Sequence, residues 1–478
     1  HLQQCRPWFS ISRGRLCVTD FSKLLNPEQF EAATYSQGPL LCLAAAGTGK
    51  TRTLVHRVAY LIENGVPAER IILLTFTNRA AREMLERAQA LSGDKVSSIW
   101  SGTFHSVCAK LLRAYGSKLG YRPGFSILDE DDQKRLIGRI IKDLVPDSKD
   151  FLKKEIVAKM ISQAANEELS VEQVSSRWQS KVANVDVDMI VKISQVYNLR
   201  KKELGAMDFD DLLVNGLNLL QTQKDVRDFL QEHFLYVLVD EYQDTNSLQA
   251  KFTDILAAKH KNIMAVGDDF QCIYTWRGAQ IENILGFPRR WPGCKIVKLE
   301  RNYRSVPGVL QVANDLMTDA SGQFDKRLKP TRASSGGSPR LYIAYDGRSQ
   351  ANEILYYISE MKSRGYSYRH MAILYRSHFH SIEIQMMLAR NRIPVKITSG
   401  IGVFEQIHIK DTLAYLRLLL NPCDELSFMR LVELLPGVGE KSAMSMWKKL
   451  AGNFDTASSA ARDAFSGLLP AKAKPVWP

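Results

Sequence analysis

Leu40-Leu41-Cys42-Leu43-Ala44-Ala45-Ala46-Gly47-Thr48-Gly49-Lys50-Thr51 decides the fold, because an apolar run leads here into a turn of small residues. The apolar run is typical of a buried parallel strand. From Thr51 onward, apolar residues return at helical spacing until Asn64-Gly65, a helix stop signal. Strand, tight turn and helix form the context of a phosphate-binding loop. Ala44 stands where the strict pattern has its first glycine, and a fortuitous Gly-Lys-Thr is the alternative.

The residues of this loop suit a nucleoside triphosphate with Mg²⁺. The Lys50 side chain would reach the β- and γ-phosphates, and the Thr51 hydroxyl would bind Mg²⁺. The start of the following helix adds partial positive charge. The backbone N–H groups expected on the phosphates are those of Ala46, Gly47, Thr48 and Gly49.

A second strand completes the expected hydrolytic site. Tyr236–Val239 is an apolar run that ends in the adjacent carboxylates Asp240 and Glu241. At the strand end, Asp240 would hold Mg²⁺ and Glu241 would orient and deprotonate the attacking water. Gln271, which follows another strand at Ile263–Val266, is placed to sense a γ-phosphate. A surface Asp-Glu pair is the alternative.

Upstream of the loop, a helix start precedes the first strand. Asn26 is expected to cap it and Pro27 to occupy its first turn. Gln29 lies one turn in, where its amide could donate to and accept from an adenine edge. A place on the helix surface is the alternative for Gln29.

Aromatic residues at other strand ends suggest single-stranded nucleic acid. Phe76 could stack on a base, or belong to the core. Tyr274, Trp276 and Arg277 interleave aromatic faces with a cation, as in a stacking platform, although core packing is the alternative. By itself, His105 is interpreted as a hydrogen-bonded structural residue.

A group of three carboxylates, Asp208, Asp210 and Asp211, opens a further helix. Helix capping and the helix dipole explain them, and a metal site is the alternative.

Composition sets the class of protein and of partner. The 478 residues suffice for two to four domains, and 45% hydrophobic with 24% charged residues is typical of a soluble globular protein. The formal net charge of +13 favours a polyanionic partner, nucleic acid before membrane.

The seven cysteines are scattered and include no Cys-x-x-Cys pair. This usage suggests a reducing compartment and argues against a zinc site or a disulfide framework. No apolar run approaches the roughly 18 residues of a membrane span. A cytoplasmic location and no membrane partner are therefore expected. The sequence starts at His1, without a Met, and stops at Pro478 without an evident ending, so we expect a piece of a longer protein.

Seven motifs in one order resemble the UvrD/Rep family of superfamily 1 DNA helicases. They are Gln29, Ala44–Thr51, Thr75–Asn78, Gly102–His105, Val239–Asn246, Val266–Asp269 with Tyr274–Ala279, and Asn302–Ser305. The resemblance runs from about residue 24 to about residue 450. It implies two RecA-like domains with ATP between them, each with an inserted subdomain, and translocation 3′ to 5′ along single-stranded DNA.

The resemblance also assigns roles. Gln29 and Arg52 would contact adenine, Tyr303 would stack on it, and Arg304 would act as an arginine finger on the γ-phosphate. The expected DNA contacts are Phe76, Thr77, Asn78, His105, Tyr274, Trp276 and Arg277. Gly437 and Gly439 lie in a segment that resembles a helix-hairpin-helix turn, which would offer backbone N–H groups to a duplex phosphate; a plain connecting turn is the alternative.

The expected fold class is α/β, with tandem RecA-like P-loop NTPase domains, helical insertions and an incomplete second RecA-like domain. The expected parts are a disordered arm or tag (1–22), a first RecA-like ATPase domain (23–114 and 206–290), a helical insertion (115–205), a partial second RecA-like domain (291–398) and a partial second insertion (399–478). Strands are expected at Arg340–Ala344 and Met371–Tyr375, with a helix around 350–361 between them.

Two later motifs of the family, a Gly-Leu-Glu-Phe-type core and a second γ-phosphate arginine, are not found before Pro478. A truncated second sheet with an exposed edge is therefore expected.

The leading hypothesis is an ATP-dependent 3′–5′ DNA helicase and translocase of repair or replication restart. Its expected partners are single-stranded and junction DNA and repair or replication proteins, with a monomer or weak dimer as the assembly. One alternative is an ATP- and DNA-binding module with little unwinding activity. Another is the helicase part of a helicase–nuclease.

Overall fold

The structure is a computed structural model that describes residues 20–145, 151–320, 322–333, 338–398 and 407–476. It forms two compact units, His1–Gly336 with Cys423–Leu426 and Gly337–Pro422 with Ser427–Pro478. The arm expected at residues 1–22 lies almost entirely outside the described residues, and the first helix, α1, begins at Phe21.

A parallel six-stranded sheet forms the centre of the first unit, in the order β3-β2-β6-β7-β1-β8. Its strands are β1 (Leu40–Ala44), β2 (Ile71–Thr75), β3 (Trp100–Thr103), β6 (Tyr236–Val239), β7 (Ile263–Gly267) and β8 (Lys295–Leu299). The expected strands around the phosphate loop and before Asp240 are confirmed. β8, which the sequence analysis assigned to the second RecA-like domain, pairs with β1 at the edge of this sheet, with Leu41 beside Ile296.

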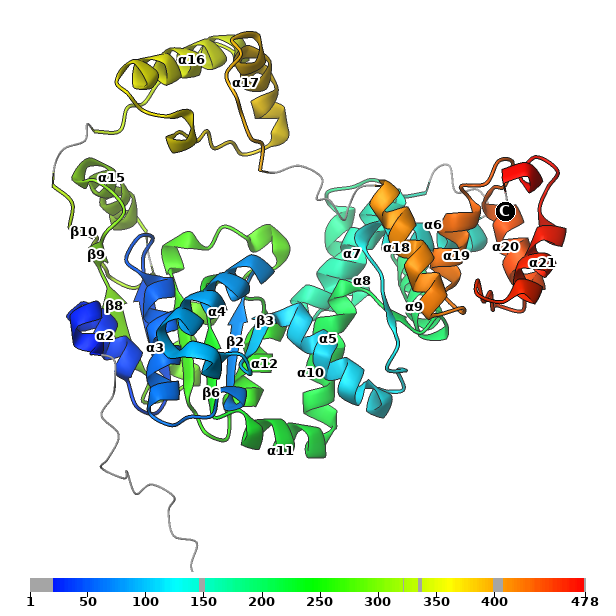
Figure 1. Cartoon of the computed structure of the whole chain (residues 1–478), viewed down its shortest axis with the longest axis horizontal. Coiled ribbons are helices and arrows are strands. Elements are labelled where there is room, and N and C mark those ends of the chain that lie inside the picture. Colours follow the sequence, from blue (N-terminus) through cyan, green and yellow to red (C-terminus); the bar gives the residue numbers. More distant parts are fainter. Residues whose placement is uncertain (1–19, 146–150, 321, 334–337, 399–406, 477–478) are drawn as a thin grey trace, which may run out of the picture. The chain divides into compact units, whose positions relative to one another are not determined.

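Helices cover both faces of the sheet, and the side chains of β1 alternate between the two layers. Leu41 and Leu43 face a core shared with α5, α10 and α12, whereas Leu40 and Cys42 face a core shared with α2, α3 and α4. Figure 1 shows α3 and α4 along one face. The helices of the two layers are α2 (Pro27–Thr34), α3 (Lys50–Glu63), α4 (Asn78–Ser92), α5 (Phe104–Tyr115), α10 (Phe209–Thr222), α11 (Lys224–His233) and α12 (Ser247–Ala257).

Local signals set the helix ends beside the phosphate loop. Asn26 caps α2 in a reciprocal capping box with Gln29, as the expected helix start requires. α3 ends at Glu63, and Gly65 follows with a φ of +86°. A glycine tolerates this left-handed conformation because it has no Cβ.

In the described part of the insertion within the first unit, four helices pack around their own apolar core. They are α6 (Glu130–Leu144), α7 (Lys154–Glu167), α8 (Val171–Gln179) and α9 (Val187–Glu203). A short parallel ladder of β4 (Ser126–Ile127) and β5 (Ala206–Met207) joins the entry and the exit of the insertion. The described residues between 115 and 205 are mainly helical, as the sequence predicts.

The first unit continues past β8 with β9 (Arg301–Asn302), α15 (Pro307–Thr318) and β10 (Lys329–Pro330). β9 and β10 pair in parallel as a separate two-stranded ladder.

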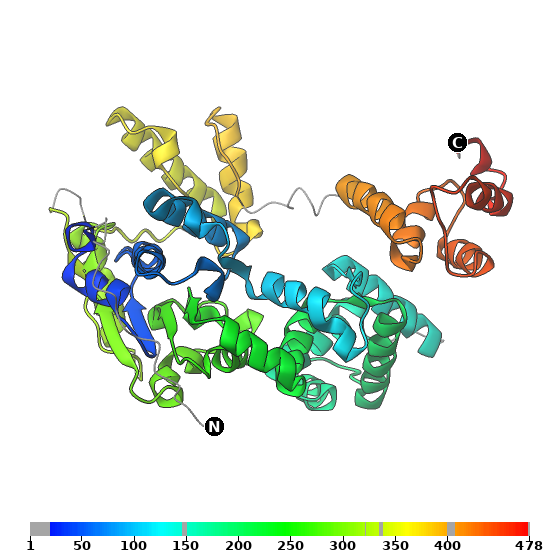
Figure 2. The ribbon, with the colours of Figure 1, turned by 60° about the horizontal axis from the view of Figure 1, so that its bottom comes forward.

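The second unit is helical in its described part. α16 (Gly347–Ser363) confirms the helix expected around residues 350–361, and it packs side by side with α17 (His378–Arg390) (Figure 2). A second cluster contains α18 (Ile407–Leu420), α19 (Glu425–Val432), α20 (Glu440–Lys449) and α21 (Ser459–Leu468).

The strands expected at Arg340–Ala344 and Met371–Tyr375 are wrong: neither segment has regular secondary structure. Their apolar side chains are exposed, with Leu341 at 90%, Ile343 at 85% and Leu374 at 95%. A β-strand is stabilised by hydrogen bonds and side-chain contacts with a neighbouring strand. Local β-propensity therefore does not suffice where no described strand lies alongside.

Within the described ranges, no helix has the length and apolar character needed to cross a membrane.

Candidate nucleotide and DNA site

The phosphate loop connects the end of β1 to the start of α3. Gly47 and Gly49 have φ values of +78° and +94°, so both adopt the left-handed conformation. A Cβ on Gly47 would lie 2.7 Å from the Arg304 Cβ, and one on Gly49 would lie 2.5 Å from the Gln29 Nε2. The loop is thus closely packed on both sides, and only glycine fits at these two positions.

Residues distant in sequence hold the carbonyl side of the loop. The Asn302 Nδ2 donates to the Ala46 carbonyl at 2.6 Å, the Tyr303 N–H donates to the Gly47 carbonyl at 2.9 Å, and the Gln29 Nε2 donates to the Thr48 carbonyl at 2.8 Å. These three contacts fix the backbone of the loop. Of the N–H groups expected on the phosphates, that of Thr48 donates to the Ala45 carbonyl at 3.2 Å.

Lys50 and Glu241 meet at the carboxyl end of the sheet, where the Lys50 Nζ lies 2.8 Å from the Glu241 Oε2. Glu241 follows β6 and adopts a left-handed conformation with a φ of +49°. For a residue other than glycine this conformation is uncommon and marks a constrained site. The structure therefore brings together the lysine and the carboxylate that the sequence placed in one hydrolytic site.

Asp240 and Asp244 are buried carboxyl groups, and each has one oxygen without a hydrogen-bond donor among the described residues. Burial and the neighbouring Glu241 raise the pKa of Asp240 to about 7, and burial raises the pKa of Asp244 to about 6. The Oδ1 atom of each is buried without a hydrogen-bond partner among the described residues. Buried carboxylate oxygens of this kind are ligands for a hard divalent cation, so the donor set fits Mg²⁺.

Gln271 is reached from Glu241 through a short chain of hydrogen bonds. The Gln243 Nε2 donates to the Glu241 Oε2 at 2.8 Å, and the Gln243 Oε1 accepts from the Asp268 N–H at 2.9 Å. Asp268 in turn accepts from the Gln271 side chain. The candidate base and the candidate γ-phosphate sensor are thus connected through two buried residues.

The residues expected around the base and the phosphates surround the loop. Tyr303 is 44% exposed, and its hydroxyl accepts from the Asn26 Nδ2 at 2.8 Å, at the start of α2. The Arg52 Nη2 donates to the Leu24 carbonyl at 2.6 Å. Gln29 is only 3% exposed, because the loop and its own capping box use its amide. Arg304 is exposed beside Gly47, and Thr51 lies in the first turn of α3.

An aromatic surface lies at the ends of β2 and β7. The rings of Phe76 and Tyr274 are 5.1 Å apart between centroids, and those of Tyr274 and Trp276 are 6.1 Å apart. Trp276 is 62% exposed. His105 packs edge-on against Phe209 at 5.9 Å, and burial lowers its pKa to about 4. Phe76, Tyr274 and His105 are half-buried, so Trp276 presents the most accessible ring. Accessible rings can stack on unpaired bases of any sequence.

The remaining expected DNA contacts have mixed positions. Thr77 caps α4 by accepting from the Ala80 N–H, and Asn78 is exposed in the first turn of that helix. Arg277 ends the turn Thr275–Arg277, but its side chain lies outside the described residues. In the second unit, Gly437 has a φ of +78° and Gly439 caps α20.

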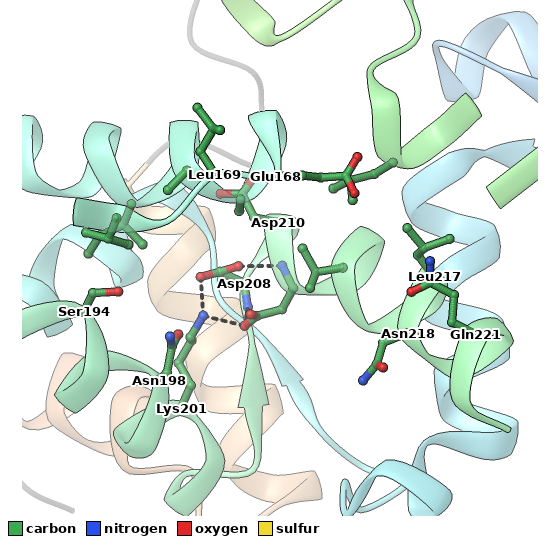
Figure 3. A pocket seen from close by; sticks show the side chains of 17 residues that line it. Glu168, Leu169, Ser194, Asn198, Lys201, Asp208, Asp210, Leu217, Asn218 and Gln221 are labelled. Carbon is green, nitrogen blue, oxygen red and sulfur yellow. Dashed lines mark hydrogen bonds and ion pairs between the residues drawn. The ribbon is translucent and has the colours of Figure 1, made fainter. Parts of the chain in front are cut away.

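A cavity of about 470 Å³ lies elsewhere, where α7 and α9 of the insertion meet α10 and α12. Figure 3 shows Asp208 and Lys201 joined on its wall. Asp208 caps α10 through a capping box with Asp211, and the Lys201 Nζ lies 2.8 Å from Asp208 and 2.6 Å from Asp211. Capping therefore accounts for these carboxylates. Among the described residues, no group of three or more His, Cys, Asp or Glu residues could hold a metal.

Three contributors to the site received no role from the sequence. Asn302 and Gln243 are buried and act through contacts far along the chain, which no local pattern indicates. Phe209 is 52% exposed at the start of α10. An apolar residue between the acidic residues of a helix start was the one available signal for it.

Comparison with known families places both parts of the chain. The family model for the UvrD/REP helicase N-terminal domain matches residues 25–292, and that for the UvrD-like helicase C-terminal domain matches residues 297–474.

Two similar relatives are proteins named ATP-dependent DNA helicase PcrA. The one from Staphylococcus aureus strain Mu50 is 37% identical over 420 residues, which cover 87% of this chain and 57% of the relative. The one from Staphylococcus epidermidis is 37% identical over 422 residues, covering 88% of this chain and 57% of the relative. The chain thus spans little more than half the length of these relatives.

Proposed function

This chain belongs to the UvrD/REP helicase family, and from that premise we propose that it is an ATP-dependent DNA helicase that moves 3′ to 5′ along single-stranded DNA. The proposed setting is DNA repair or replication restart, in the cytoplasm, as a monomer or weak dimer. Single-stranded DNA and its junctions with duplex are the proposed substrates, and repair or replication proteins the proposed partners.

One observation carries the proposal: the phosphate loop, the Asp240-Glu241 pair and the segment 302–304 converge on one place. Lys50 contacts Glu241 from one side, and Asn302 and Tyr303 contact the loop from the other. Such a convergence of a cation, paired carboxylates and loop N–H groups suits a nucleoside triphosphate and little else.

In the proposed mechanism, Lys50 exchanges its contact with Glu241 for the β- and γ-phosphates. Glu241, held from behind by Gln243, then accepts a proton from the attacking water. Asp240 and Thr51 would hold Mg²⁺, which neutralises phosphate charge when bound. Gln271 contacts the γ-phosphate from the end of β7.

Adenine would be bound between the start of α2 and the segment after β9. Gln29 and Arg52 lie in the first turns of α2 and α3, and the hydroxyl of the exposed Tyr303 accepts from Asn26. Arg304, exposed against Gly47, is the proposed arginine finger. It would stabilise charge that develops on the γ-phosphate.

DNA would run over the aromatic surface. Phe76, Tyr274 and Trp276 supply stacking faces. His105 is uncharged at neutral pH because of its lowered pKa, so its imidazole would contact a base as a neutral ring. Thr77, Asn78 and Arg277 would contact the same strand, and Gly437 with Gly439 a duplex phosphate.

The test is ATP hydrolysis with and without single-stranded DNA. We expect stimulation of turnover by DNA, its loss in Lys50→Ala, and retained Mg·ATP binding without turnover in Glu241→Gln. Hydrolysis that is unaffected by either substitution would contradict the assignment of the site.

A second candidate is an ATP- and DNA-binding module with little unwinding activity. A third is the helicase part of a helicase–nuclease. The segments 340–344 and 371–375, which have no regular structure, favour a weak motor. A strand-displacement assay distinguishes the proposed helicase from the binding module: ATPase activity without strand displacement supports the module.

A further inference from the structure

The segment between α15 and β10 places one lysine against the end of β7, at a position for which the motifs assign no role. Lys326 is 8% exposed, and its ammonium contacts both Asp268 and Asp269, which are 3% and 1% exposed. The ammonium also lies 4.8 Å from the centre of the Phe270 ring. The lysine is thus sequestered with two adjacent carboxylates.

The backbone around Lys326 is fixed to the same turn. The Phe324 N–H donates to the Asp269 Oδ2 at 2.8 Å, and the Gln323 Nε2 donates to the Asp269 carbonyl at 3.0 Å. These contacts join residues more than fifty positions apart. The lysine therefore has a fixed position relative to the end of β7.

Asp268 connects this lysine to the nucleotide site. Its Oδ1 contacts Lys326 and accepts from the Phe270 N–H at 3.2 Å, and its Oδ2 accepts from the Gln271 side chain. Its N–H donates to the Gln243 Oε1 at 2.9 Å. A Cβ on the preceding Gly267 would lie 2.6 Å from that same Gln243 oxygen, so Gln243 packs closely against the backbone before Asp268.

Two adjacent buried carboxylates without a cation would repel each other and require other donors. The amide of Gln271 is one such donor within reach. Without Lys326, Asp268 would change its orientation or bind the Gln271 amide differently, and the amide would lose its fixed direction. Lys326 would therefore influence the orientation of Gln271, the residue proposed to face the γ-phosphate, through Asp268.

We propose that Lys326 is a positioning residue for nucleotide hydrolysis, which fixes Gln271 through Asp268 and so sets how the site distinguishes a triphosphate from a diphosphate. This inference rests on the proposed function, because it needs Gln271 at the γ-phosphate.

The test compares the affinities of a non-hydrolysable ATP analogue and of ADP, with Mg²⁺, in the full chain and in Lys326→Met. We expect the ratio of the two dissociation constants to fall at least fivefold towards equal binding, and kcat for ATP to fall at least tenfold with KM changed less than threefold. A purely structural role would lower the melting temperature and weaken both nucleotides alike, leaving their ratio unchanged.

The matched control is Lys329→Met. Lys329 lies three residues further on, and its side chain is 64% exposed where it pairs with Glu300. Its removal should leave both the affinity ratio and kcat within twofold of the unmodified chain.

A second variant, Asp268→Asn, serves if Lys326→Met does not fold. It leaves Lys326 paired with Asp269, so the remaining buried ion pair is charge-balanced, while Gln271 loses its anionic acceptor. An unchanged affinity ratio in a folded variant would overturn the inference alone. An unmodified chain that binds neither nucleotide would overturn the proposed function and the inference together.

Discussion

At the scale of single residues, the site depends on positions where the close packing leaves no space for a Cβ atom. Gly47 illustrates this, because its left-handed backbone and its two close neighbours exclude a side chain for independent reasons. A residue with a Cβ in this conformation would be strained by about 1–3 kcal/mol, a cost that glycine avoids.

Gly47→Ala should weaken nucleotide binding at least tenfold, because the added methyl group would force Arg304 or Asn302 off the loop. Gly65→Ala is the matched control, since Gly65 has a similar φ of +86° but nothing within 4 Å of its Cβ position. Titration with a fluorescent ATP analogue measures both. Equal effects of the two substitutions would show that backbone strain alone matters.

His105 supplies a prediction about pH. Burial lowers the pKa of its imidazole from 6.5 to about 4 in the folded chain. Between these pH values the unfolded chain binds a proton that the folded chain does not, so the contribution of His105 to stability is present above pH 6.5 and is lost as the pH falls towards 4.

The free energy of unfolding should therefore fall less steeply over this pH range in His105→Gln than in the unmodified chain. Subtracting the two curves removes the carboxylates that titrate in both. Parallel curves would contradict the lowered pKa, as would an imidazole NMR titration centred near 6.5.

At the scale of elements, the C-terminal end of α7 connects the insertion to helices that cover the central sheet of the first unit. Near the C-terminus of α7, the Asn166 Nδ2 donates to the Asp210 Oδ1 at 2.8 Å, and its Oδ1 accepts from the Asn246 Nδ2 at 2.9 Å. Asn246 caps α12 directly after the Asp240–Thr245 segment. The orientation of α7 is thereby tied to the starts of α10 and α12.

Asn166→Leu should destabilise the first unit, because polar atoms of Asp210 and Asn246 would lose their partners at a cost of about 1–3 kcal/mol each. A fall of the melting temperature by a few degrees is expected, since about 2–4 °C corresponds to 1 kcal/mol in domains of about 150–250 residues and the first unit is larger. Asn64→Leu, which removes an exposed amide bonded to the Tyr60 carbonyl, should have little effect. A melting temperature unchanged by Asn166→Leu would mean that α7 does not depend on this contact.

At the scale of the whole molecule, the excess of positive charge predicts how DNA binding responds to salt. With 64 basic and 51 acidic residues, the chain carries a formal charge of +13. Each phosphate that a basic side chain neutralises releases condensed counterions, and this makes affinity depend on ionic strength.

The logarithm of the affinity for single-stranded DNA should fall linearly with the logarithm of the salt concentration, with a slope of about −0.7 per phosphate contact. Five contacts would give a slope of about −3.5. Fluorescence anisotropy at several salt concentrations measures it, and substitution of Trp276 by Ala should weaken binding without changing the slope. A flat response would contradict a role for the charge.

The sequence by itself determined the elements around the phosphate loop, because these depend on residues close together along the chain. The apolar run before the phosphate loop became β1, the helical spacing after it became α3, and Asn26 with Gln29 formed the expected capping box. The motifs also assigned Lys50 and Glu241 to one predicted site, whereas their direct contact is a feature of the tertiary structure.

Only the tertiary structure decided which distant segments meet. It placed β8 beside β1, Asn302 on the Ala46 carbonyl and Lys326 on Asp268, and it left the residues of 340–344 without a strand. Strand pairing and buried ion contacts depend on neighbours that are hundreds or dozens of residues away. Local periodicity contains no information about those neighbours, so the propensity of a segment becomes a structure only where the fold supplies a partner.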